Sequence, residues 1–241
     1  MRGSLPVSAS LAFALAFFAG APAAHADWVT FTGTGADGLS ASASFTTVDG
    51  NLVVVLTNTS TMDVTVPSQV LTGVWFSAPG ELTPLLAVVN FGSAINNDIE
   101  FPFVGGEWAY RGDLSMSFGA NSGISSTGLG VFGPGDRFVG PDLDPPTSPA
   151  GLNYGITSAG DNPATGNGGV NSTPLIQNSV VFVLGGWNPE WSLSQIVNVI
   201  FQYGTSLDEP RLAAVPEPGV LALLGVGLVG LVFAGRKFSW A

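Results

Sequence analysis

The chain has 241 residues, a formal net charge of −11, no cysteine and a single histidine. Only six cations stand against 17 acidic residues, which leaves no basic patch to displace counterions from phosphate and excludes nucleic-acid binding. The lack of cysteine excludes disulfides, cysteine nucleophiles and cysteine-ligated metal centres.

The first 26 residues have the organisation of a secretory signal peptide. A cation lies next to the N-terminus, residues 11–19 (LAFALAFFA) form an apolar stretch, and Ala24-His25-Ala26 provides a small-x-small cleavage site. We therefore expect cleavage after Ala26 and export of the mature chain. Because His25 is the only histidine, the mature chain would have neither imidazole nor thiol for catalytic triads or for the common zinc, haem and iron-sulfur sites.

Residues 27–214 are expected to form one exported domain. Their number is sufficient for one sizeable core, which a domain without disulfides requires. Short alternating or β-branched segments recur between glycines and prolines, and only residues 191–200 are ambiguous between strand and helix. We therefore predict an all-β fold, a single β-sandwich with the jelly roll as one form to consider, and no long helix outside the two terminal hydrophobic segments.

The clearest segment is a β-hairpin. Residues 39–47 (LSASASFTT) alternate between apolar and hydroxyl side chains, Asp49-Gly50 is a turn signal, and residues 52–58 (LVVVLTN) return as a β-branched strand. Further strands are expected at residues 70–76, 85–91, 114–118, 179–184 and 197–203.

Residues 133–175, called the excursion below, interrupt this series of strands. They contain 9 glycines and 7 prolines and are too long for an ordinary connection within a domain. Leu152, Tyr154 and Ile156 alternate within them, which predicts that part of the excursion packs down as a short strand.

The excursion is also rich in the oxygen ligands that calcium prefers. Its spacing matches no established calcium loop, and Asp and Asn are common turn formers, so an irregular surface loop is the alternative interpretation. The carboxylates considered for a calcium site are Asp136, Asp142, Asp144 and Asp161.

Tryptophans and carboxylates offer the other candidate chemistry. Trp187 and Trp191 flank the turn Asn188-Pro189, where two rings could form a stacking platform for a glycan. The alternative is that these rings belong to the core. The Asp and Glu residues fit no recognisable glycosidase motif, and we therefore expect no enzymatic activity.

The C-terminal 27 residues, 215–241, combine a tetrapeptide, an apolar run and a basic end. Val215-Pro216-Glu217-Pro218 is expected to be extended, because proline disfavours the helical region for the residue before it. Residues 219–235 (GVLALLGVGLVGLVFAG) carry no charge and as a helix would span about 25 Å, slightly less than a hydrocarbon core of about 30 Å. Arg236 and Lys237 follow at once and favour a cytoplasmic C-terminus.

This order of tetrapeptide, transmembrane helix and basic doublet resembles the tail of the PEP-CTERM proteins, bacterial surface proteins processed by exosortase. The resemblance implies that Pro216, Glu217 and Pro218 are a sorting signal for a membrane-embedded, cysteine transpeptidase-like enzyme. It also implies an inner-membrane anchor before processing and a later location at the cell surface or in an exopolysaccharide-rich matrix such as a biofilm. No Leu-Pro-x-Thr-Gly motif precedes the apolar run, unlike in sortase substrates.

Residues 39–60, 70–76 and 178–210 also resemble the body of a recurrent family of exosortase-dependent surface proteins. That resemblance implies a single β domain and no particular chemistry. We therefore expect a non-enzymatic exported surface or matrix protein. The alternative hypothesis is a carbohydrate-binding module or a glycan-acting enzyme carried on the same anchor.

Overall fold

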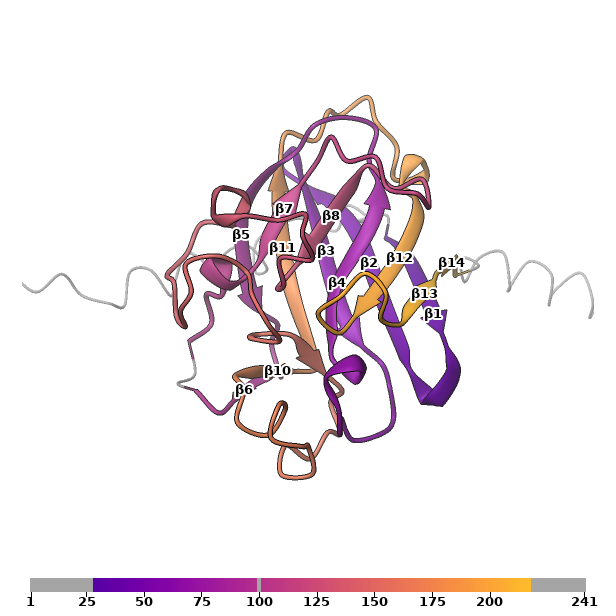
Figure 1. Ribbon diagram of the computed structural model, residues 1–241. Helices are drawn as coiled ribbons and strands as arrows, with labels where there is room; N and C mark the ends of the chain where they lie inside the picture. The colour runs from indigo at the N-terminus through magenta and orange to yellow at the C-terminus, as the bar shows by residue number, and fades with distance from the viewer. Residues whose placement is uncertain (1–27, 99–100, 218–241) are drawn as a thin grey trace, which may run out of the picture.

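The computed structural model describes residues 28–98 and 101–217. These residues form two open β-sheets that pack face to face, as Figure 1 shows, with short 3-10 turns and no α-helix among them. The expected all-β, sandwich-like fold is therefore confirmed, and the jelly-roll form stays a prediction. No helix in this described part of the chain has the length and apolarity needed to cross a bilayer.

Three of the predicted segments lie outside the described residues. They are the signal peptide at residues 1–26, the apolar run at residues 219–235 and the basic doublet Arg236-Lys237. The same holds for Pro218, the last residue of the tetrapeptide.

The first sheet, called sheet A, has six strands, and every neighbouring pair is antiparallel. The predicted hairpin forms its centre, and Asp49 and Gly50 make the turn with φ values of 48° and 74°, the left-handed conformation that Asp and Gly tolerate best. The strands in spatial order are β14 (Val215–Pro216), β1 (Val29–Thr34), β2 (Ser40–Val48), β3 (Asn51–Asn58), β11 (Ser179–Gly185) and β5 (Thr83–Val89).

The second sheet, called sheet B, has eight strands, of which β7 and β8 branch from β4. Only the pair β9 and β10 is parallel. In spatial order its main path is β13 (Arg211–Ala213), β12 (Val197–Tyr203), β4 (Leu71–Ser77), β9 (Ile156–Thr157), β10 (Leu175–Gln177) and β6 (Ala94–Asn96), with the branch β8 (Ser122–Ser125) and β7 (Ala109–Arg111).

Five 3-10 turns connect these strands, and none exceeds three residues. Residues 191–200, ambiguous in sequence, contain one such turn followed by most of β12. The turns are η1 (Ala36–Gly38), η2 (Pro67–Gln69), η3 (Gly105–Glu107), η4 (Pro134–Asp136) and η5 (Leu193–Gln195).

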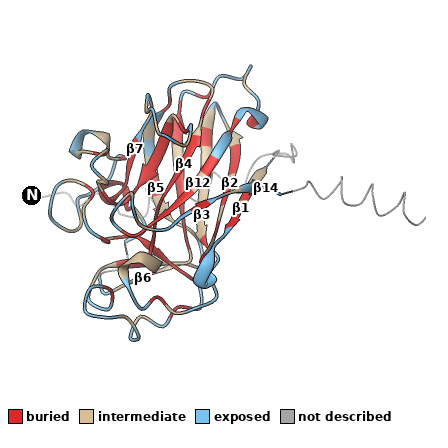
Figure 2. Cartoon of the chain, turned by 45° about the vertical axis from the view of Figure 1, so that its right-hand side comes forward, coloured by how far each residue is buried: buried red, intermediate tan, exposed pale blue. Residues whose placement is uncertain are grey.

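The main core lies between the two sheets (Figure 2), where alternate residues of β2 and β3 are buried and almost every residue of β4 and β11 is buried. Aromatic rings meet across this space at edge or tilted angles, which suits their quadrupoles. Phe45 and Phe76 have ring centroids 5.4 Å apart, and Trp108 and Phe182 have centroids 4.9 Å apart. The core therefore supplies the stability that a chain without cysteine cannot obtain from disulfides.

The outer face of sheet B has a second, smaller core. Trp75 projects from β4 and stacks on Phe132 at 5.5 Å, with Phe118 against its edge. The predicted strand at residues 114–118 is wrong, because this segment is a turn that lays Leu114, Met116 and Phe118 over Trp75. An alternating pattern suits a loop that packs on a sheet as well as it suits a strand.

The other predicted strands correspond to β4, β5, β11 and β12, with small shifts at their ends. The excursion consists mainly of turns and contributes β9, which confirms that part of it packs down as a short strand. Only Ile156 of the alternating trio enters that strand, and Tyr154 is buried in a turn with φ 57°. Leu152 joins a satellite cluster with Val64, Val70, Val170 and Leu175.

Candidate functional site

The C-terminal tetrapeptide begins as the outermost strand of sheet A. β14 pairs antiparallel with β1, so that Pro216 lies opposite Phe31 and Val215 lies opposite Thr32. The N–H of Glu217 donates to the carbonyl oxygen of Thr30 over 2.8 Å. Figures 1 and 2 both place β14 beside β1 at the edge of the molecule. The three described residues of the tetrapeptide are therefore held in extended form by the first strand of the domain.

The register explains how a proline fits into this ladder. Thr30 and Glu217 form a hydrogen-bonded pair, and in an antiparallel ladder the next pair along is non-hydrogen-bonded. Pro216 occupies that next position, so the N–H that proline lacks would have faced away from β1. The proline costs no ladder bond and removes a donor from the free edge, which discourages pairing with other chains.

The segment before the tetrapeptide closes the side of the sandwich. β13 pairs with β12 of sheet B, and the N–H of Ala214 then donates to the carbonyl oxygen of Val199 at 2.9 Å. One residue later the chain belongs to sheet A. Residues 211–217, called the closing segment below, thus join the edges of both sheets.

Leu212 anchors the closing segment and is only 6% exposed. Its side chain fills space left by two glycines that flank β1 residue Thr34. A Cβ at Gly35 would lie 2.3 Å from Leu212 Cδ2, and a Cβ at Gly33 would lie 3.2 Å from Leu212 Cβ. A larger residue at either glycine would require the Leu212 side chain to shift from this position.

The side chains of the three described residues of the tetrapeptide remain accessible. Val215 is 65% exposed, and Pro216 and Glu217 are exposed as well. The backbone of the described tetrapeptide is therefore bound to the domain, whereas its side chains are free for recognition by a partner.

The aspartates considered for calcium have individual roles within the protein. Asp136 caps η4 by accepting the N–H of Gly133 at 2.8 Å, and Asp142 forms an ion pair with Arg137 at 3.2 Å. Both interactions are local to the excursion, which is the turn-forming role that such residues commonly have.

The other two aspartates connect separate segments. Asp161 is 6% exposed and accepts the N–H of Val64 at 2.7 Å, and Asp144 accepts from the side-chain amide of Asn153. Within residues 28–98 and 101–217, no three potential ligands gather into a group that could hold a metal ion. The structure does not bring the four aspartates together, and the calcium site stays a prediction.

Trp187 and Trp191 do lie together, with ring centroids 5.5 Å apart at 89°. Trp187 is only 5% exposed and belongs to the main core, and the partly buried Trp191 packs against that core and over Gly80. Stacking of a sugar on Trp187 would require the surrounding loop to open. The pair's glycan-binding role stays a prediction.

A buried carboxylate, Glu107, was not singled out from the sequence. It is 5% exposed, and its Oε1 accepts the N–H groups of Leu143 at 2.5 Å and Asp144 at 3.2 Å. Burial raises the pKa of Glu107, while the two backbone donors oppose that rise. The only signal in the sequence is the pair of glycines before it, because a Cβ at Gly106 would lie 1.9 Å from the carbonyl oxygen of Pro141.

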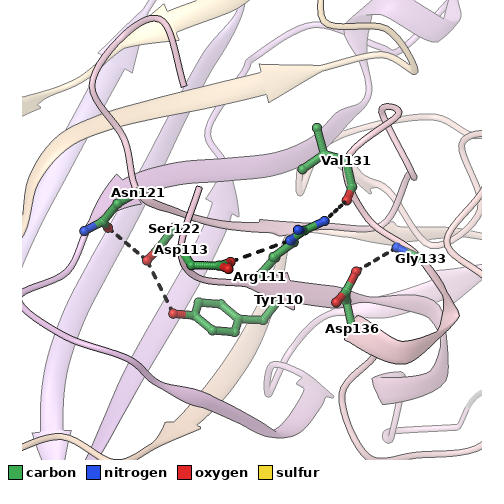
Figure 3. Close-up of polar contacts among 8 residues, drawn as sticks. All are labelled: Tyr110, Arg111, Asp113, Asn121, Ser122, Val131, Gly133 and Asp136. Atoms are coloured by element: carbon green, nitrogen blue, oxygen red, sulfur yellow. Dashed lines mark hydrogen bonds and ion pairs between the residues drawn. The ribbon is translucent and has the colours of Figure 1, made fainter. Parts of the chain in front are cut away.

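A polar cleft of about 520 Å³ lies beside β7. Figure 3 shows the polar contacts of residues in and around it, including Tyr110, Arg111 and Asp113. Arg111 Nε lies 3.7 Å from an Asp113 carboxylate oxygen, and Arg111 Nη1 donates to the carbonyl oxygen of Val131 at 3.0 Å. The hydroxyl of Tyr110 hydrogen-bonds with Ser122, and burial raises the pKa of this tyrosine. The polar groups drawn in Figure 3 thus bond to one another. Such bonds indicate a role in holding the structure together.

We predict that Leu212→Ala lowers the free energy of unfolding by about 2–5 kcal/mol, as for other buried leucines, and loosens the closing segment in particular. Trypsin should then cut after the exposed Arg211 faster than it does in the unaltered chain. Val215→Ala is the control and should change stability by less than about 0.5 kcal/mol, because Val215 is mostly exposed. Equal acceleration of cleavage at Arg111 and Arg211 would contradict a local role for Leu212.

We predict that Glu107→Gln flattens part of the pH dependence of stability. A carboxyl group whose folded pKa is raised binds its proton more tightly in the folded state, so its contribution to stability falls as pH rises from about 4.5 through the folded pKa. Glutamine keeps an oxygen for both backbone donors and removes the buried charge. Urea unfolding of both chains from pH 4 to 7 should therefore show the variant gaining relative stability as pH rises. Parallel curves for the two chains would refute a raised pKa of Glu107 in the folded state.

Comparison with known proteins identifies the last part of the closing segment and the residues after it. Residues 214–237 match the family described as the PEP-CTERM protein-sorting motif. No curated protein and no solved structure matches the chain. The match begins at Ala214, the residue at which the chain passes from sheet B to sheet A. The chain thus carries a PEP-CTERM protein-sorting motif, which implies an exported, membrane-sorted protein that is processed by an exosortase.

Proposed function

We propose that the chain is a non-enzymatic protein of a bacterial surface or extracellular matrix, delivered there by exosortase. It is held at the inner membrane by residues 219–235 until the enzyme acts on its tail. It then stays at the cell surface or enters an exopolysaccharide-rich matrix. The observation that carries this proposal is the PEP-CTERM match over residues 214–237.

The position of the tetrapeptide supports this role. The N–H of Glu217 is bonded to β1, and the apolar run begins two residues later, so almost no linker separates the folded domain from the expected membrane segment. The enzyme would therefore meet its signal at the surface of the domain. Pairing with β1 already fixes the extended backbone, which lowers the entropy that recognition must overcome.

The absence of enzymatic activity is the second part of the proposal. With the signal peptide removed, the chain has neither histidine nor cysteine to act as base or nucleophile. The carboxylates described above serve as caps, ion-pair partners and backbone acceptors. These roles support a structural or binding protein.

We predict that Glu217→Ala, made in the full chain in its native host, slows removal of the tail and leaves more unprocessed protein in the membrane fraction. The reason is that Glu217 is the exposed, charged residue at the centre of the motif. Mass spectrometry and fractionation of the protein report both effects. Glu190→Ala removes an exposed glutamate elsewhere and should leave processing unchanged. A second variant lacks Pro216, Glu217 and Pro218 altogether. If its mature mass and its location equalled those of the unaltered chain, exosortase sorting would be refuted.

A further inference from the structure

The two sheets differ in how their outer faces are covered. Sheet B carries the small core around Trp75, built by the loops that follow β7 and β8. The outward side chains of sheet A contain many aliphatic groups, yet Val53, Val55 and Val183 belong to none of the hydrophobic clusters formed by the described residues. Sheet A therefore has an apolar outer face over which no cluster of the described residues packs, with Val53, Val55 and Val183 partly exposed and Val181 9% exposed.

Strand register makes this face continuous. Val55 lies opposite Val181, which lies opposite Val88, and Val88 bridges to Phe103. A second row runs parallel to the first from Val53 through Val183 to Leu86. The apolar face is defined here by the six aliphatic residues Val53, Val55, Leu86, Val88, Val181 and Val183.

The borders of the apolar face are neutral as well. On one side lie the hydroxyl groups of β1 and β2, where Thr30 and Ser44 bond to each other at 2.9 Å. On the other side lie Leu85 and Phe101, which are 40% and 38% exposed. None of the six strands of sheet A contains Asp, Glu, Lys or Arg, although the whole chain carries a net charge of −11.

This distribution of charge favours one occupant. Two copies of an acidic chain repel each other over most of their surfaces, and the outer face of sheet A is where they can approach without opposing charges. Flat aliphatic faces of β-sheets pack well on one another, at a spacing of about 10 Å. A two-fold axis would make the contact self-complementary, because each copy offers the same rows of valine.

We propose that the apolar face is a self-association surface, on which a second copy of this chain packs sheet to sheet. This inference goes beyond the proposed sorting function and does not depend on it. Exosortase handling concerns the opposite edge of sheet A, at β14, whereas the apolar face spans β3, β11 and β5.

The size of the face sets the strength of the contact. Its three strands at about 4.8 Å and six residues per strand at about 3.3 Å give roughly 300 Å² per copy, or about 600 Å² in total for the apolar face itself. Stable specific interfaces commonly bury about 1,600 Å². The association is therefore weak and reversible, and it operates where copies are concentrated on a membrane or in a matrix.

The test uses the fact that the chain has no cysteine. Val55→Cys in the full chain, treated in intact cells with a bismaleimide of about 10 Å reach, should give a cross-linked product with twice the mass of the chain. Val139→Cys is the matched control, because Val139 is 70% exposed but lies in the excursion, and it should stay monomeric. Any of three results would overturn the proposal. They are equal cross-linking of both variants, no product from Val55→Cys, and a product that contains a different protein.

A second change separates specific packing from chance encounter. Val183→Lys added to Val55→Cys places a charge in the apolar face and should lower the cross-linked yield at least about tenfold. Val139→Lys added instead should leave the yield unchanged. Val183→Thr keeps the shape of valine and is the control for misfolding of the lysine variant. It must lower the cross-linked yield as well. A yield that neither substitution at Val183 lowers would refute the apolar face as the contact.

Discussion

The backbone hydrogen bonds between β1 and the start of the sorting motif join the two ends of the domain. They place Val215 and Pro216 beside β1, which begins at Val29, three residues after Ala26 at the expected signal-peptidase site. The closing segment is held at both sheet edges, with Leu212 seated over Gly33 and Gly35. The first three residues of the sorting tetrapeptide are thus part of the fold of the protein that it sorts.

This continuity links folding to delivery. β1 must lie between β2 and β14, so the edge that receives the motif exists only after the N-terminal strand has joined the sheet. The pairing of β14 is short and its side chains are exposed, and such edge strands open more readily than central ones. The motif is thus extended and positioned by a folded domain, yet it can be released without unfolding the core.

The rest of the domain is organised by what each sheet buries. Sheet B is covered by the loops over Trp75 and pairs with part of the excursion. The buried carboxylate of Glu107 helps to attach the excursion by accepting the N–H of Leu143. Among the residues that the structure describes, no hydrophobic cluster packs over the valine rows of sheet A, and the strands of this sheet contain no charged residue. The outer face of sheet B is therefore covered by the protein's own loops, whereas the outer face of sheet A is suited to contact with another molecule.

The sequence predicted those elements whose pattern is local. The alternation of β2, the Asp49-Gly50 turn and the β-branched β3 carry their own signal, and so does the order of tetrapeptide, apolar run and basic doublet. β14 could not be predicted in this way, because prolines normally argue against a strand and only the register with β1 makes Pro216 harmless. The conformation of residues 114–118 depends on contacts with the distant Trp75, and the burial of Glu107 depends on its bond to Leu143. No local sequence pattern contains this information.

Amide hydrogen exchange at Glu217 tests the central claim most directly, because its N–H is the last described bond between the motif and β1. In the folded, unprocessed chain, the amides of Ala214 and Glu217 should exchange at least about tenfold more slowly than in a free peptide of the same sequence, since exchange then requires local opening. Exchange of the Glu217 amide at the free-peptide rate, with Ala214 still protected, would show that the motif hangs free of the domain and would contradict this account.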